Sequence, residues 1–533
     1  MNTNRSTLKA LLALALLPAL LYPLAQVQAE PGGQIYYVDQ GNPLASDSND
    51  GSQSAPWLTV QHAAGVAVAG DTVYVLPGFY PERVVPVNSG SPGSRLTFQA
   101  LPRRSATLWG FYTVNSDYLT IQGFNITTDD SLTGWTEGPG VFIHSNGVKV
   151  IDNYFYDLDS TAIQGYWHEP FPEDATIANN RIYHVQMGIG VTGFNWRVEG
   201  NEVERLYNYG GGDCDYSRFF GEGHVISGNY FHGTNFDEIG DAHVDCFQTF
   251  DNNGEYIRDI TIENNICSDF HQGVMGEASY HRNSSGLLLQ NNIFMHGGAW
   301  GLCLYQIRDI TVVHNVFSDI RYHGIGMSDG SNGTVTNNIF YNAGSNYWAG
   351  DGGSLVGSHN LLYRTGDSID PSEFPQDLVN LDPLFVDPAG DDYHLLPASP
   401  SINAGLNTGT PYDIEGTSRP QGAGMDIGAY EFVPSLSLTG VAGDASINLI
   451  WSVNVEIPVT TTWQISYDGP PGIPPSPITG LDGETRSVSI SGLTNYTWYH
   501  LTLEAVLAGD AFLTGTTAAM PTDHALYMPW IAR

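Results

Sequence analysis

Acidic residues gather in two segments of the chain whose spacing could place carboxyl groups side by side. The first segment covers residues 210–218 and the second covers residues 237–249. We expect Asp213 to stand beside Asp245 on neighbouring strands, roughly 5 Å apart. Two carboxyl groups at that distance either share a proton or hold a divalent cation. In the first case one acts as an acid and the other as a base or nucleophile, as in a retaining glycosidase.

Two histidines and a glutamate flank this expected pair. His243 and His271 each lie two residues before an expected strand, and either could relay protons at neutral pH. Each could equally form hydrogen bonds within a turn. Glu277 is placed about 14 Å from Asp245, which is too far for a direct acid/base pair, so it is interpreted as a substrate contact.

Calcium binding is the alternative use of the acidic residues. Asp213, Asp215 and Asp241 offer the oxygen ligands that calcium prefers. No other cofactor is indicated, and an aspartate in a tight turn can also cap backbone N–H groups without any catalytic role. Arg218 lies in the first acidic segment and is assigned to substrate binding.

Four aromatic side chains predict contacts to sugar rings. Tyr166, Trp167, Trp300 and Tyr305 occur in or next to segments that are expected to form strands. Rings on the outward side of a strand can stack on a pyranose. Exposed aromatic rows also protect the faces of sheets, so both interpretations stay open.

A short pattern, apolar-x-x-Asn-x-apolar, recurs along the chain and defines the elements that would position these residues. Its asparagines are separated by 21 to 36 residues. The units are rich in β-branched, aromatic and glycine residues with alternating apolar positions, which favours strands over helices. Each unit is therefore interpreted as one coil of a solenoid that is stable only when stacked on its neighbours. The asparagines expected to form a hydrogen-bonded ladder are Asn153, Asn180, Asn201, Asn229, Asn265, Asn292, Asn315, Asn338 and Asn360.

A second strand is expected about nine residues after the asparagine in most units. The units between Asn201 and Asn265 carry insertions, which are expected to form loops over a binding face. Alignment of residues 245–248 with residues 273–276 puts Cys246 inside and Asp245 outside. We then expect a disulfide between Cys214 and Cys246, with Cys267 as a buried thiol.

With these features the chain resembles the secreted bacterial right-handed β-helix repeat proteins, over roughly residues 34–432. The resemblance implies an all-β fold, a right-handed parallel β-helix. It implies less about activity, because the group includes polysaccharide lyases, glycoside hydrolases, epimerases and noncatalytic surface proteins. The motifs similar to the group's terminal coils are Tyr36-Tyr-Val-Asp39, Asn49-Asp-Gly51, Pro56-Trp-Leu-Thr59, residues 69–80, Leu381-Asp-Pro-Leu-Phe385, Tyr393-His-Leu395, residues 399–405 and Asp426-Ile-Gly-Ala-Tyr-Glu431.

The beginning of the chain is typical of an export signal. Residues 1–29 contain Arg5 and Lys9, an apolar run from Leu11 to Leu21, and small residues that suit cleavage before Glu30. The β-helix with its cap is assigned to residues 30–433. No later stretch has the roughly 20 apolar residues that a membrane-spanning helix needs. We therefore expect a secreted or extracellular protein, with attachment to the cell surface left open.

The character of the chain changes after the β-helix. Residues 435–522 alternate like the strands of a small β-sandwich. The spacing from Leu493 through Tyr499 to Ala505 resembles the tyrosine corner of a fibronectin type III module. Residues 523–533 are assigned to a short C-terminal tail.

The charge of the chain limits its partners. The formal net charge is −37 at pH 7, which repels nucleic acid and anionic membranes and excludes a nucleic-acid role. A polysaccharide or oligosaccharide is the expected partner, and the protein is expected to be a monomer. A polyanionic glycan would need clustered arginines or bridging cations.

Three functions remain open from the sequence. A polysaccharide-cleaving enzyme of the glycoside hydrolase type, centred on Asp213, Asp245 and His243, is slightly favoured. A calcium-assisted polysaccharide lyase is the first alternative, because Arg218, Arg258 and Arg282 could serve it, whereas Lys149 lies away from the loops. A noncatalytic glycan-binding or cell-surface solenoid is the second.

Overall fold

The computed structural model describes residues 32–128, 138–210, 212–250, 256–277, 284–366, 374–455, 457, 460–468, 477–507 and 510–523. The expected signal, its cleavage site before Glu30 and residues 524–533 of the expected tail lie outside these ranges. None of the helices in the described residues is both long and apolar enough to cross a membrane.

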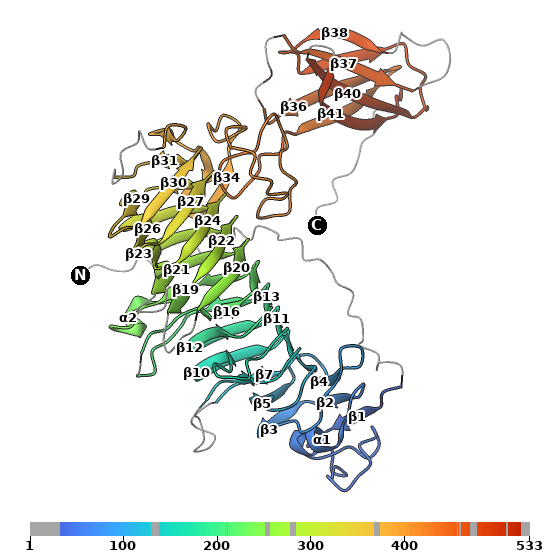
Figure 1. Cartoon of the computed structure of the whole chain (residues 1–533). Helices are drawn as coiled ribbons and strands as arrows, with labels where there is room; N and C mark the ends of the chain where they lie inside the picture. The colour runs from blue at the N-terminus through green and yellow to red at the C-terminus, as the bar shows by residue number, and fades with distance from the viewer. Residues whose placement is uncertain are drawn as a thin grey trace, which may run out of the picture.

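The main body is a right-handed parallel β-helix, as expected, and it consists of stacked coils whose strands form two large parallel sheets (Figure 1). The first sheet comprises β1 (Ile35–Val38), β2 (Thr72–Val75), β4 (Leu96–Ala100), β6 (Leu119–Gln122), β9 (Lys149–Ile151), β11 (Thr176–Ala178), β13 (Arg197–Glu199), β17 (Val225–Ser227), β20 (Ile257–Glu263), β22 (Ser285–Gln290), β24 (Arg308–Val313), β27 (Asn332–Thr336) and β30 (Ser354–Ser358), with β16 (Gly221–Glu222) beside β20.

The second sheet bends around a corner of the helix and so covers two of its sides. In β10, β12, β21 and β23 one long strand continues through the corner, whereas other coils use two separate strands. Its members are β3 (Gly78–Val84), β5 (Ala106–Tyr112), β7 (Asn125–Ile126), β8 (Val141–Ile143), β10 (Tyr154–Gly165), β12 (Arg181–Val191), β14 (Glu202–Glu204), β15 (Ser217–Phe219), β18 (Tyr230–His232), β19 (Asp245–Phe250), β21 (Ile266–Glu277), β23 (Ile293–Tyr305), β25 (Val316–Ile320), β26 (His323–Ser328), β28 (Ile339–Tyr341), β29 (Ser345–Ala349), β31 (Leu361–Tyr363) and β32 (Leu378–Val379).

Helices are short and lie at the margins of the β-helix. The helix α1 (Val60–Val66) buries Val60, Ala63 and Ala64 in the core at the N-terminal end. The helix α2 (Phe236–Ile239) lies in the insertion before β19, and the side chain of Asn235 caps it by accepting from the N–H of Asp237. Beyond β32 the chain adds the short strands β33 (Phe385–Asp387) and β34 (Asp392–Leu395), joined by the 3₁₀ turn η2 (Pro388–Gly390).

The asparagine ladder is confirmed. Each ladder asparagine, from Asn180 to Asn360, accepts hydrogen bonds through Oδ1 from the backbone N and Nδ2 of the preceding one, at 2.8 to 3.1 Å. Asp377 ends the ladder, because its Oδ1 accepts the same two bonds from Asn360. The ladder satisfies backbone groups that are fully withdrawn from water and fixes the pairing of successive coils.

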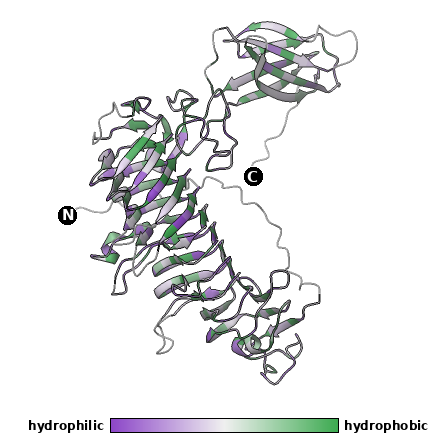
Figure 2. Cartoon of the chain, viewed as in Figure 1, coloured by the Kyte–Doolittle hydropathy of each residue, from purple (hydrophilic) through white to green (hydrophobic). Residues whose placement is uncertain are grey.

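The core is a column of apolar side chains inside the coils, and Figure 2 shows hydrophobic and hydrophilic residues alternating along the strands. The residue two positions after each ladder asparagine points inward, and Phe294, Phe317 and Phe340 stack on one another. A glycine at the start of the second strand lies against this stack. A Cβ at Gly301 would lie 2.8 Å from Phe317, and one at Gly324 would lie 2.4 Å from Phe340. The corner therefore pairs a glycine with a large ring in the next coil.

One disulfide occupies this same corner, and it corrects the expected pairing. Cys246 bonds to Cys267, with their Cα atoms 6.3 Å apart, while Cys214 and Cys303 are buried thiols. Cys246 thus takes the place of the corner glycine, and Cys267 takes the place of the large ring in the next coil. The expected Cys214–Cys246 bond is wrong because the N–H of Cys214 donates to the carbonyl of His243, which leaves it two residues out of register with Cys246.

Peptide mapping under nonreducing conditions should therefore recover Cys246 linked to Cys267, with Cys214 and Cys303 alkylated as thiols. Because the bond closes a loop with a sequence separation of 21, its reduction should lower the free energy of unfolding by about 3 kcal/mol. A disulfide containing Cys214 would contradict the coil register described above.

The C-terminal part of the β-helix region covers one side of the later coils. The residue directly after the ladder asparagine points outward; it is polar or aromatic in early coils, for example Arg181 and Glu202, and aliphatic in later ones. The later positions form a second buried cluster together with the covering segment. This cluster comprises Ile293, Met295, Val316, Ile339, Leu361, Phe385, Tyr393, Leu395, Ile427 and Ala429. A buried ion pair between Arg419 and Glu431 at 2.7 Å holds the segment together.

The residues after the β-helix form a small antiparallel sandwich, as expected. Tyr499 is buried, and its hydroxyl accepts a hydrogen bond from the N–H of Thr494 at 3.0 Å, the contact expected of a tyrosine corner. The three-stranded sheet contains β35 (Leu436–Gly443), β36 (Ser446–Val453) and β39 (Ser487–Ser491), and the four-stranded sheet contains β37 (Thr462–Tyr467), β38 (Ile478–Asp482), β40 (Tyr499–Leu507) and β41 (Asp510–Ala519).

Candidate functional site

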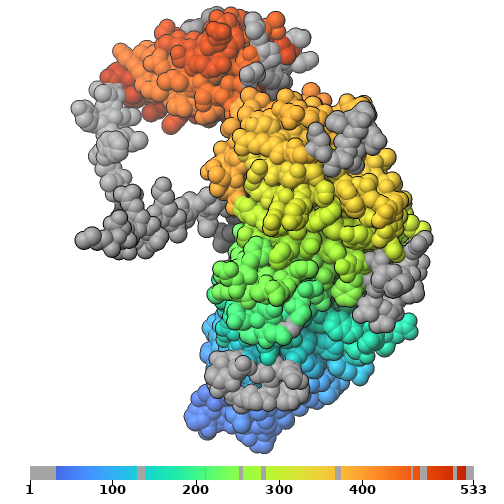
Figure 3. All heavy atoms as spheres, turned by 90° about the vertical axis from the view of Figure 1, so that its left-hand side faces the viewer, coloured from blue at the N-terminus to red at the C-terminus, as the bar shows by residue number. Residues whose placement is uncertain are grey.

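The candidate site lies on the outward side of the second strands, and we call this side of the β-helix the site face. The strands of the site face are β8, β15, β19, β26 and β29 and the second halves of β10, β12, β21 and β23. Figure 3 shows the molecule from the side that carries α2 and β29. In this view the coils, coloured from blue to yellow along the chain, pack against one another. Strand register places one outward residue of each coil in a single line: Gln164, Gly190, Arg218, Gln248, Met275, Cys303, Gly326 and Trp348.

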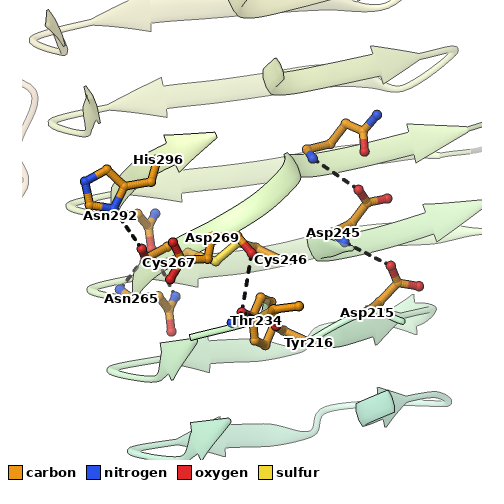
Figure 4. Close-up of a disulfide and its surroundings, with 12 residues drawn as sticks. Asp215, Tyr216, Thr234, Asp245, Cys246, Asn265, Cys267, Asp269, Asn292 and His296 are labelled. Atoms are coloured by element: carbon orange, nitrogen blue, oxygen red, sulfur yellow. Dashed lines mark hydrogen bonds between the residues drawn. A yellow bond between two sulfur atoms is a disulfide. The ribbon is translucent and has the colours of Figure 1, made fainter. Parts of the chain in front are cut away.

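Asp215, rather than Asp213, lies beside Asp245. The backbone N–H of Asp245 donates to Oδ1 of Asp215 at 3.0 Å, and the N–H of Tyr216 donates to the carbonyl of Asp245 (Figure 4). The expected Asp213–Asp245 pair is therefore wrong by two residues, for the same reason as the disulfide. Because both coils carry insertions, the register that the backbone hydrogen bonds define could not be recognised from the sequence.

Asp245 is buried, which corrects its expected exposure on the outer face. Its side chain is 1% exposed, and its strand pairs it with Gln272. Oδ1 accepts from the backbone N–H of Gln272 at 3.2 Å, and Oδ2 lies 3.3 Å from Nε2 of Gln248. Burial and, after it, the charge of Asp215 raise the pKa of Asp245 well above its ordinary value. Asp245 thus keeps its proton at pH values where an ordinary aspartate has lost it.

Asp215 is the charged partner in this buried pair. It is fully buried, and Nε of Arg218 donates to its Oδ2 at 2.6 Å. Burial raises the pKa of Asp215 as well, but Arg218 opposes this rise. Among the described residues, Arg218 lies within salt-bridge distance of Asp215 and not of Asp245, which favours the negative charge of the pair on Asp215 and the proton on Asp245.

Two glutamine side chains beside Asp245 carry acceptor oxygens without donors. Oε1 of Gln248 and Oε1 of Gln272 are both buried and have no hydrogen-bond partner among the described residues. Buried polar atoms are nearly always paired in folded proteins, so an unpaired acceptor next to an acidic proton is unusual. A hydroxyl donor from a ligand would satisfy either oxygen.

Asp213 and His243 lie at the edge of the pair. The Asp213 side chain is 39% exposed, and its Oδ2 lies 4.0 Å from Arg218. Its Oδ1 accepts from the backbone N–H of His243 at 3.3 Å. Asp213 is consequently the carboxylate of this group that solvent reaches, whereas Asp215 is enclosed.

His271 is held against His243 and α2. The rings of His243 and His271 lie 5.5 Å apart, and Phe236 of α2 lies 4.8 Å from His271. Nδ1 of His271 accepts from the N–H of Val244 at 3.0 Å, so Nε2 is the nitrogen available for proton transfer. Burial and His243 lower the pKa of His271. The expected alignment of the two histidines is off by one residue, since His271 lies beside Val244.

The aromatic residues expected to bind sugar divide into two groups. Trp300 and Tyr305 lie on the site face in the second coil after that of Asp245, Trp300 in register with Gln272 and Tyr305 next to Leu304, the partner of Gly276. Oη of Tyr305 is 3.7 Å from Sγ of Cys303. Tyr166 packs on His144, with ring centroids 3.7 Å apart, several coils toward the N-terminus, and Trp167 beside it is 44% exposed.

Glu277, which the sequence predicts as a substrate contact, is exposed at the end of β21. It pairs with Phe250 rather than with Thr249, so it lies one residue farther along from Asp245 than expected. Sequence reasoning missed Gln248, Gln272, His323 and Trp348. The correct strand register would have identified them, because they lie in the same lines across the coils as Arg218 and Asp245.

The residues expected to bind calcium do not form a cation site. Arg218 contacts both Asp213 and Asp215, and a guanidinium repels a second cation. Asp241 is exposed and does not join them in a cluster of potential ligands within the described residues. The cluster whose ligand atoms do lie within 4.8 Å of one another is Glu202, Glu204 and His232, and Arg181 already forms salt bridges with both glutamates.

Comparisons with known proteins find one family model and several similar chains. Residues 171–365 match the family described as right handed beta helix region. The uncharacterized protein YwoF of Bacillus subtilis (strain 168) is 22% identical over 460 residues, which cover 72% of this chain and 95% of YwoF. Among solved structures, pectate lyase Pel9A is 16% identical with a TM-score of 0.47, covering 75% of this chain and 96% of its own. The complex of XylC with xylose is 12% identical with a TM-score of 0.46, covering 75% and 98%.

Proposed function

We propose that this protein is exported and cleaves a polysaccharide by glycoside hydrolysis on the site face. In this proposal Asp245 is the general acid that protonates the leaving oxygen. Asp213, the exposed carboxylate beside His243, activates the attacking water or attacks the sugar itself. Asp215 and Arg218 are positioning residues, which set the protonation state of Asp245 without contacting substrate.

The observation that carries the proposal is the buried Asp215–Asp245 pair with a single arginine. Glycoside hydrolysis needs one carboxyl group that is protonated and another that is ionised at the same pH, and environments that separate their pKa values provide this. Burial without a cationic partner among the described residues does so for Asp245. Asp213 supplies the second carboxyl group, with a side chain that is 39% exposed and lies 4.0 Å from Arg218. The unpaired oxygens of Gln248 and Gln272 add acceptors for sugar hydroxyls next to the acid.

The described residues favour hydrolysis over elimination by a lyase. A lyase needs a base for the proton beside a uronate carboxyl group, and Arg218 is already engaged in a salt bridge with Asp215. Arg258 pairs with Glu222 in the first sheet, where Lys149 also lies. Arg282 is outside the described residues.

A panel of neutral and acidic polysaccharides tests the proposal with the mature full chain. We expect new reducing ends from at least one neutral glycan, without the ultraviolet absorbance of unsaturated uronates. Unsaturated products would mean that the protein is a lyase and not a hydrolase. Saturable binding without any cleavage would leave a noncatalytic glycan-binding solenoid. Boiled protein and the Asp245→Asn variant are the matched controls.

A further inference from the structure

We infer that Trp300, His323 and Trp348 form a subsite for a neutral β-linked pyranose chain, on the C-terminal side of Asp245. These three residues are called the aromatic corner below. The inference rests on the proposed function and specifies its substrate class. Strand pairing links Trp300 to Gln272 and Gln272 to Asp245, so the corner begins two coils, roughly 10 Å, from the acid.

The three rings lie in contact with one another. His323 and Trp348 are nearly parallel, with an interplanar angle of 29° and centroids 5.9 Å apart. Trp300 stands at 79° to Trp348, with centroids 5.6 Å apart, and lies 4.4 Å from His323. A pyranose can stack its apolar C–H face on the solvent-accessible face of one ring while its edge rests against another. All three side chains are half-buried, so solvent still reaches them.

A glycine in the outward line of the site face makes room for this arrangement. Gly326 lies between Cys303 and Trp348 in that line. A Cβ at Gly326 would lie 2.3 Å from Cζ3 of Trp300 and 3.3 Å from Cε3 of Trp348. Both indoles therefore lie against the bare backbone at this position, and any larger residue would push them apart.

The chemistry of the corner favours an uncharged, flat glycan. Nδ1 of His323 hydrogen-bonds with Oγ of Ser345, which orients the ring and leaves Nε2 for a sugar hydroxyl. Burial lowers the pKa of His323, so the ring is neutral at neutral pH. None of the arginines in the described part of the chain stacks on Trp300 or Trp348. With a net charge of −37, the protein repels polyanions.

The β linkage follows from the flat faces of the aromatic rings. Chains of β-linked sugars with equatorial substituents are ribbons that present broad apolar C–H faces. Such a ribbon could lie on His323 and Trp348 and continue along the outward line toward Asp245. Helical α-linked chains present a curved surface, which flat ring faces contact over fewer atoms.

Binding to defined oligosaccharides tests the subsite in the full mature chain carrying Asp245→Asn, so that probes remain uncut. Cellohexaose, xylohexaose and mannohexaose are titrated by calorimetry and tryptophan fluorescence, with hexagalacturonate as the polyanionic comparison. We expect at least one neutral hexasaccharide to bind more tightly than hexagalacturonate. Adding Trp348→Ala should weaken that binding about tenfold. Gly326→Ala should also weaken it although no ring is lost, and Trp348→Phe should retain part of it.

The matched control is Tyr412→Ala, which removes another exposed aromatic ring, 57% exposed, from the covering segment; it should leave binding unchanged. Circular dichroism and thermal melting verify that each variant folds. If Trp348→Ala does not fold, Trp348→Phe is used in its place. Absence of binding to all three neutral probes would overturn the subsite. So would tighter binding of hexagalacturonate, or binding that neither Trp348→Ala nor Gly326→Ala changes. Trp348-dependent binding by a protein that cleaves nothing would keep the subsite and reject hydrolysis.

Discussion

Replacement of Asp245 by asparagine should abolish polysaccharide cleavage while the protein remains folded. The amide can accept the hydrogen bond from the N–H of Gln272 as the carboxyl group does. Its NH₂ group can donate to Oε1 of Gln248, an acceptor that has no partner in the described structure. An amide has no acidic proton to give to a leaving group, so kcat should fall by several orders of magnitude. Reducing-end assays measure the loss.

The matched control is Asp377→Asn, which changes another largely buried carboxyl group whose pKa burial also raises, at the end of the asparagine ladder. It should cleave at the wild-type rate. Full activity of Asp245→Asn on a glycan that the wild type cleaves would contradict the acid role and move the search to Glu277 and His271.

The stability of the same variant should depend on pH in a predictable direction. The pKa of Asp245 is raised in the folded protein. Its contribution to stability is therefore complete below the ordinary pKa of about 4, and is lost as pH rises through the raised value. Asp245→Asn lacks this loss. Urea unfolding of both proteins across this range should show the variant gaining stability relative to wild type as pH rises.

Replacement of Asn292 by alanine should have the largest effect on stability. Its Oδ1 accepts from the backbone N and Nδ2 of Asn265, both at 3.0 Å. Its Nδ2 donates to the carbonyl of Ile262 at 2.8 Å and to Oδ1 of Asn315 at 3.0 Å. Alanine leaves these buried groups unpaired, so the free energy of unfolding should fall by about 4 kcal/mol. Urea unfolding followed by circular dichroism measures it.

Asn407→Ala is the control for the ladder. Asn407 is exposed, and its Oδ1 accepts a hydrogen bond from the N–H of Gly409 in a loop. Its loss should change the free energy of unfolding by less than about 1 kcal/mol. Equal effects of the two substitutions would mean that the ladder contributes no more than an ordinary turn.

The sequence by itself determined the coils. Each ladder asparagine and the apolar residues two positions before and after it could be recognised, because every coil repeats the same local pattern. The inward positions of Ile189, Val274 and Leu302 follow from the alternation of side chains along a strand, and all three are fully buried. The sandwich was also recognisable, because its strands alternate as strands with one buried face do.

Only the tertiary structure decided the register of the two coils that carry insertions. An insertion before a strand can be aligned in several ways, and a shift of one residue moves every side chain to the opposite face. The expected alignment matched Asp245 with Gly273, whereas the strands pair Asp245 with Gln272. A shift of two residues paired Asp213 with Asp245 and Cys214 with Cys246.

The disulfide shows which physical signal could have resolved this. In several other coils the corner carries a glycine that faces the inward side chain of the next coil, as Gly301 faces Phe317. Cys246 and Cys267 occupy that same relation, so the steric match of small and large residues across coils defines the register. Burial of Asp245 could not be predicted in the same way, because it depends on side chains from neighbouring coils that the chain brings together only when it folds.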